Sequence, residues 1–202
     1  MTFTENANNI FDRAVADYHK ADNVDAQWPN PYPEGSLDAI LYDKCLVDAR
    51  QWHLEDIVRD PDVALEEAIA IKRRIDKSNQ VRTDMVEDID SYFLSKYKDV
   101  APLADATINT ESPAWAIDRL SILALKLWHM AEQADRKDAG DEHRQRAAGK
   151  LAVLLEQRRD LSTAIDQLLD DIAAGKKYMK VYRQMKLYND PATNPALYGK
   201  KS

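Results

Sequence analysis

The chain of 202 residues is 45% hydrophobic and 31% charged, a balance typical of one globular domain with a hydrophobic core. Its few glycines and prolines argue against a disordered chain and against a turn-rich β protein. Cys45 is the only cysteine, which excludes a disulfide framework and a thiolate metal cluster. No apolar run reaches the length of a membrane span and no secretory signal pattern is present, so we expect a cytoplasmic protein without a membrane partner.

The net charge of -7 is unevenly distributed along the chain. Residues 174–202 hold seven lysines and arginines against one aspartate, so this segment carries +6 and residues 1–173 carry -13. An acidic body disfavours sequence-independent binding of nucleic acid, while the basic end favours contact with an anionic partner. A protein partner or a homo-oligomer is left open.

The first predicted element is a helix over residues 4–20, where apolar residues recur on one side. Three prolines and a glycine exclude a continuing helix in residues 21–35, which we interpret as a rigid connector. Trp28 and Tyr32 are expected to fold this connector back onto the body.

Two helices are predicted next. Ser36 is a suitable N-cap for the second helix, which ends at Asp60-Pro61 because the residue before a proline is disfavoured in a helix. Asp62 is expected to cap the third helix, which runs to about Lys96.

The fourth predicted helix is the central one. It follows a second connector over residues 97–111 and begins at Ser112-Pro113, a cap followed by proline at the first helical position. Residues 114–135 are apolar almost all round in their middle part, as expected of a helix with neighbours on several sides. The helix is broken near Gly140.

The C-terminal part is predicted to contain a fifth helix over residues 142–174, with Gly175 just past its end, and a short sixth helix over residues 177–188. Residues 189–202 read as an irregular basic tail, and residues 178–198 are expected to pack on the body with their lysines outward. The sequence thus predicts an all-α fold, one domain over residues 1–202 built as a bundle of five to six long antiparallel helices.

Polar residues occupy positions in these helices where a core helix would be apolar. Arg82 lies at the centre of the apolar stripe of the third helix, with Asn79 and Asp90 on its shoulder. A polar row on the second helix separates two apolar stripes and has helical spacing: Lys44, Asp48, Gln51, Glu55 and Arg59. One interpretation of Lys44 and Arg59 is a solvated boundary.

The fourth and fifth helices carry similar residues. Arg158 lies among the leucines of the fifth helix, and Asp118 and His129 share one side of the fourth. Because a guanidinium cannot shed its charge, each arginine needs an anionic partner or water. We expect Arg82 to be largely buried and bonded to Glu55 or Asp118.

The first functional hypothesis is a polar pocket between helices that binds a small anionic ligand bearing a phosphate or carboxylate group. Two converging guanidinium groups could hold such an anion, with amides and carboxylates around them. The candidate ligand-binding residues are Arg82, Arg158, Asn79, Gln51, Glu55 and Asp118. A second hypothesis is a non-catalytic scaffold whose internal salt bridges are sealed and whose basic, tyrosine-rich end docks on a partner.

A third hypothesis involves Mg²⁺ and leaves catalysis open. Glu87 and Asp90 are spaced to share a divalent cation, with Glu55 on the neighbouring helix. This resembles half of the paired acidic motif of the all-α nucleotide pyrophosphohydrolases of the MazG type, whose other half the second helix lacks. The first hypothesis needs no metal and no cofactor.

Four segments carry a wider resemblance: WHLEDIVRD at residues 52–60, KRRIDKSNQVRTDMVEDID at 72–90, SPAWAIDRLSILALKLWHM at 112–130 and VYRQMKLYNDPATNPALYG at 181–199. Together they resemble the bacterial family called domain of unknown function 4254. The resemblance implies a bacterial intracellular protein of about this size. It implies no activity and no site residue.

Overall fold

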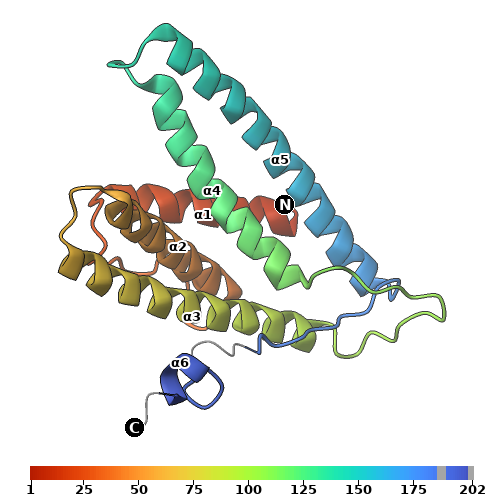
Figure 1. Cartoon of the computed structure of the whole chain (residues 1–202). Helices are drawn as coiled ribbons and strands as arrows, with labels where there is room; N and C mark the ends of the chain where they lie inside the picture. The colour runs from red at the N-terminus through yellow and green to blue at the C-terminus, as the bar shows by residue number, and fades with distance from the viewer. Residues whose placement is uncertain (186–189, 200–202) are drawn as a thin grey trace.

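The computed structural model describes residues 1–185 and 190–199. These residues form five long helices and one short helix (Figure 1): α1 Phe3–His19, α2 Leu37–Arg59, α3 Leu65–Lys96, α4 Pro113–Asp135, α5 Asp141–Ala173 and α6 Pro195–Tyr198. No β-strand occurs in the described part of the chain. The predicted all-α, single-domain bundle is confirmed.

The helix starts depend on local hydrogen bonds that the sequence indicated in part. The Ser36 hydroxyl accepts a hydrogen bond from the backbone N–H of Ala39 at 3.1 Å, which satisfies one of the free donors at the start of α2. The predicted cap at Asp62 is wrong. The third helix begins at Leu65 without a side-chain cap, and the backbone N–H of Asp62 donates to the Asp60 carboxylate instead.

The long helices pair as two antiparallel hairpins, α2 with α3 and α4 with α5, and α1 lies between them (Figure 1). Helix α4 packs against α1, α2, α3 and α5, which confirms its predicted central place. The connector over residues 21–35 folds back as expected, with Trp28 and Tyr32 packed on the hydrophobic core. None of the described helices is long and apolar enough to cross a membrane.

The predicted sixth helix over residues 177–188 is not found. Residues 178–185 follow α5 without regular structure, and residues 186–189 lie outside the described part. A four-residue helix, α6, stands instead in the tail that was predicted to be irregular. The packing of residues 178–198 is also only partly as expected, because Met179 contacts the core whereas Tyr182 and Met185 are exposed.

Gly175 ends α5 in a conformation that other residues rarely adopt. Its φ is +72°, and a Cβ atom built there would lie 2.7 Å from the backbone oxygen of Ala101. Gly149, in the middle of α5, has open space around the same position. Substitution of the two glycines, one inside α5 and one just past its end, is therefore expected to have opposite effects on stability.

We expect Gly175→Ala to lower the free energy of unfolding by about 1–3 kcal/mol, because the left-handed backbone is strained and backbone atoms cannot move aside cheaply. Gly149→Ala is the matched control and should raise it by about 0.5–1 kcal/mol. Urea denaturation of both variants measures this difference. Equal effects of the same sign would contradict the assigned end of α5.

Candidate functional site

Two cations and two carboxylates form a compact network between α2, α3 and α4. Lys44 Nζ lies 2.5 Å from Asp48 Oδ2 and 2.7 Å from Asp118 Oδ1. Arg82 Nε lies 2.5 Å from Asp48 Oδ1, and its Nη2 lies 3.0 Å from Asp118 Oδ1. The Ser121 hydroxyl donates to Asp48 Oδ2 at 2.7 Å. Each aspartate thus bridges the lysine and the arginine.

Burial explains why these groups must pair. The Lys44 and Asp48 side chains are 0% exposed, and the ionised form of either alone would lose its hydration at a cost of several kcal/mol. Burial lowers the pKa of Arg82, but the charges and hydrogen bonds of Asp48 and Asp118 raise it by more, so the pKa lies above its ordinary value. The guanidinium is therefore charged, and the formal charges of the two cations and the two carboxylates sum to zero.

Arg82 is the most exposed member of the network: its side chain is 21% exposed, against 12% for Asp118 and 0% for Lys44 and Asp48. The expectation that it is largely buried is thus too strong. A guanidinium has five N–H groups, and the network uses one on Nε and one on Nη2. Among the described residues, no acceptor takes the other three.

Two hollows meet at Arg82, with volumes of about 380 and 320 Å³. The first lies between α2, α3 and α4 and is lined by Asp48, Gln51, Trp52, Glu55, Arg59, Arg82 and Ile122. The second is lined by Asn79, Arg82, Thr83, Val86, Trp115, Asp118 and Gln184. Each hollow therefore joins polar groups to an apolar wall.

The walls of the first hollow are held by side-chain contacts. The Trp52 ring stacks on His129 of α4, with centroids 5.0 Å apart and an interplanar angle of 18°. Gln51 donates to the Asn79 side-chain oxygen at 2.9 Å and accepts from the Ser78 hydroxyl at 2.9 Å. These bonds link α2 to α3 and fix the amide beside Arg82.

The predicted partners of Arg82 are found in part. Asp118 contacts it, but Glu55 does not: the Glu55 carboxylate lies 3.6 Å from the guanidinium of Arg59, which is exposed. Asp48, which the sequence placed in the polar row without a role, is the second partner. The solvated interpretation holds for Arg59 and is wrong for Lys44.

Arg158 does not converge with Arg82, so this part of the predicted pocket is corrected. Its Nε donates to Asn8 Oδ1 at 2.9 Å, and its Nη2 lies 2.7 Å from Asp12 Oδ2, both on α1. The apolar face of α5 near Arg158 meets α1, and its arginine pairs across that contact. It lines a separate, shallow hollow between these two helices.

The carboxylates of the magnesium hypothesis also lie apart. Glu55 pairs with Arg59, Glu87 lies 3.8 Å from Arg183, and Asp90 accepts from the Ser112 hydroxyl at 2.9 Å. Among the described residues, no three side chains of His, Cys, Asp or Glu are placed to hold a metal ion together. Asp90 serves the start of α4 instead.

A family model described as protein of unknown function (DUF4254) matches residues 38–181. The chain belongs to this family. The matched range contains all four charged members of the network and most residues around the two hollows. No curated protein and no solved structure matches the chain.

Removal of the Arg82 side chain tests how much this network stabilises the DUF4254 protein. We expect Arg82→Ala to lower the free energy of unfolding by about 3–5 kcal/mol, because Asp48 and Asp118 would share one buried cation. Arg59→Ala, which breaks an exposed pair, should cost less than about 1 kcal/mol. Urea denaturation would show this contrast, and equal losses would mean that Arg82 stabilises little.

A second test uses pH. Burial raises the pKa of Asp90 above its ordinary value of 3.8, and the Ser112 hydroxyl and the Ala114 backbone N–H lower it by less. As the pH rises above about 4, the unfolded state releases this proton first, so Asp90 lowers the free energy of unfolding. The decrease ends once the pH passes the raised pKa of the folded state.

We therefore expect Asp90→Asn to gain stability over the wild type as the pH increases from about 4 towards neutrality. Urea denaturation at several pH values measures the gain. Asp88→Asn, an exposed position on the same helix, controls for the loss of one carboxylate. A gain that shrinks with rising pH would contradict the raised pKa.

Proposed function

We propose that this protein binds a small ligand through a carboxylate or phosphate group, which Arg82 receives where the two hollows meet. The observation that carries the proposal is that Arg82 is fixed by ion pairs and still has hydrogen-bond donors to offer. It is held by two aspartates, it reaches solvent, and three of its N–H groups have no acceptor among the described residues.

Fixing the guanidinium in advance favours binding. Side chains immobilised on association cost about 0.5–1.5 kcal/mol each, and Arg82 has already lost this freedom in the folded protein. Its planar group can present two parallel N–H bonds to one anion. Gln51 and Asn79 add amide groups nearby, and Trp52 and Ile122 offer an apolar wall for the rest of a ligand.

The balance of charge limits the strength of such a site. Lys44 and Arg82 are matched by Asp48 and Asp118, so an incoming anion meets two carboxylates close to its binding group. Affinity must then come from the hydrogen bonds of Arg82 and from contacts with the walls, rather than from surplus positive charge. This favours a ligand with an apolar or aromatic body over a bare inorganic ion.

The same balance supports a second candidate function, a scaffold whose network is purely structural. A neutral set of two cations and two carboxylates fixes how α2, α3 and α4 are placed without needing a ligand. The nucleotide hydrolase is not favoured by the geometry, because Glu55, Glu87 and Asp90 contact different partners.

Ligand-dependent melting separates the two candidates. We expect the melting temperature to rise with one or more of phosphate, sulfate, carboxylates and a nucleotide panel, because a ligand that binds only the folded state stabilises it by about 2.7 kcal/mol at 100 times its Kd. Titration calorimetry on the active compound then gives the affinity. Both measurements use the full chain.

Two variants locate the site. Arg82→Lys keeps a positive charge but loses the planar fork, so the shift in melting temperature should fall to a small fraction of the wild-type shift. Arg158→Met is the control and should leave the shift unchanged, because Arg158 pairs with α1. If no compound moves the wild-type melting curve, the ligand proposal fails and the scaffold remains.

A further inference from the structure

The segment after α5 begins with a short backbone pairing to the second connector, built around one isolated β-bridge. The backbone N–H of Leu103 donates to Gly175 O at 2.8 Å, and that of Thr107 donates to Lys176 O at 3.0 Å. The N–H of Tyr178 donates a hydrogen bond to Thr107 O at 3.1 Å, and Thr107 and Lys177 form a parallel β-bridge. The chain thus pairs like a strand at this point.

Beyond Tyr178 the strand-like segment continues without a partner. Residues at 177, 179 and 181 are half-buried against the body, while Tyr178, Lys180 and Tyr182 are exposed, an alternation typical of a strand with one face covered. Among the described residues, no backbone N–H or C=O group from Met179 to Met185 is hydrogen bonded. This is an open edge supported from one side.

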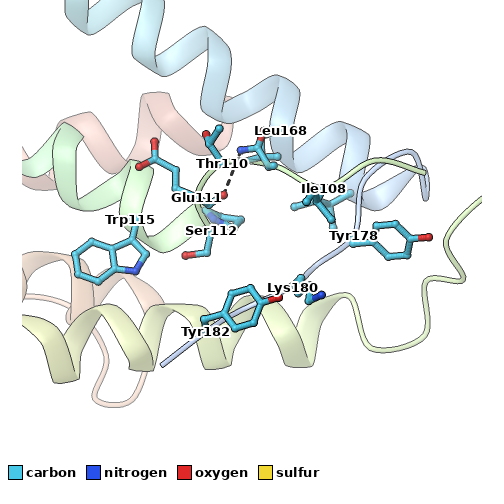
Figure 2. A pocket seen from close by; sticks show the side chains of 12 residues that line it. Ile108, Thr110, Glu111, Ser112, Trp115, Leu168, Tyr178, Lys180 and Tyr182 are labelled. Atoms are coloured by element: carbon cyan, nitrogen blue, oxygen red, sulfur yellow. Dashed lines mark hydrogen bonds between the residues drawn. The ribbon is translucent and has the colours of Figure 1, made fainter. Parts of the chain in front are cut away.

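The exposed face of this edge adjoins a pocket of about 250 Å³ (Figure 2). Tyr182 and Lys180 line it from the segment, and Ile108 and Trp115 line it from the second connector and the start of α4. Tyr182 is 75% exposed and Ile108 is 69% exposed, so two large apolar side chains beside the pocket are in contact with solvent. The pocket offers a place for a side chain of a strand laid along the edge.

The charge of the edge is opposite to that of the rest of the protein. Lys176, Lys177, Lys180 and Arg183 follow one another within eight residues, in a chain whose residues 1–173 carry -13. Lys176 lies 3.6 Å from Asp171 and Arg183 lies 3.8 Å from Glu87, so the cation that an incoming carboxylate meets first is Lys180. Lysines on an open edge repel a second copy of the same edge, which discourages self-pairing. They attract a strand that carries carboxylates.

We propose that residues 176–183 are the docking edge for an extended acidic peptide segment of a partner protein. The partner lies alongside this segment as an added strand: its backbone pairs with the free N–H and C=O groups after Tyr178, and its carboxylates face Lys180. An apolar side chain of the partner enters the pocket beside Tyr182. This inference is independent of the ligand site at Arg82.

Nucleic acid and a second copy of the chain fit this edge less well. The acidic body opposes a polyphosphate backbone outside the few residues of the edge, and the same lysines on two edges repel each other. Backbone pairing also requires N–H and C=O groups in the partner. A peptide supplies them in the spacing that the edge presents.

Hydrogen exchange and fluorescence anisotropy test the proposal on the full chain. The probe is a labelled peptide of alternating glutamate and valine, compared with a lysine–valine peptide and with the glutamate peptide N-methylated at alternate residues. We expect the glutamate peptide to bind about tenfold more tightly than the two comparison peptides. The lysine–valine peptide loses the charge attraction, and the N-methylated peptide loses backbone hydrogen bonds. The glutamate peptide should also slow amide exchange in residues 179–185 at least about tenfold.

Single variants assign the contact. Lys180→Glu should weaken binding of the glutamate peptide at least about tenfold and Tyr182→Ala by a smaller factor, while Lys150→Glu, an exposed change of equal charge on α5, should leave it within about twofold. The proposal is overturned if the N-methylated peptide binds as tightly as its parent. It is equally overturned if Lys150→Glu weakens binding as much as Lys180→Glu, or if exchange in residues 179–185 is unchanged.

Discussion

The full burial of one ammonium group determines how the centre of this protein is built. Lys44 Nζ has no contact with solvent, so two carboxylates must reach it, and they come from different helices. Asp48 and Asp118 together carry one more negative charge than Lys44 can match, which Arg82 supplies from a third helix. The placement of α2, α3 and α4 therefore has to satisfy a set of bonds of about 2.5–3.0 Å, which apolar packing alone would not specify.

This network connects stability to the candidate site. The bonds that keep Asp48 and Asp118 from being stranded also hold Arg82 in one orientation, with part of its guanidinium at the surface. A substitution of Arg82 consequently affects folding and any ligand at once, so the site is better examined through changes that preserve its charge or alter its neighbours. Trp52 is such a neighbour, because it lines the hollow without entering the network.

Much of the fold could be predicted from the sequence, since helix periodicity, Ser36 and the prolines all reflect local physics.

The polar seam was predicted for Arg82 and Asp118 because both lie on apolar faces. The pairing itself could not be derived: Lys44 and Asp48 have a spacing that fits a solvated row as well as a buried one, and only the position of α4 distinguishes them. The prediction that Arg158 converges with Arg82 failed because periodicity does not show which helix a given face meets. The face of α5 that carries Arg158 meets α1. Residues 177–182 have apolar and polar positions that fit both a helix and a strand, and pairing with Thr107 favours the extended form.

The two proposed surfaces share structural elements although they rest on different observations. Trp115 lines both the pocket beside Tyr182 and the second hollow at Arg82, and Gln184, two residues beyond Tyr182, lines that hollow as well. A strand bound along residues 179–185 would therefore contact one wall of the ligand site. If both sites are occupied in the cell, thermodynamic linkage requires the influence to be reciprocal, so that a ligand at Arg82 changes the affinity of the docking edge by the same factor.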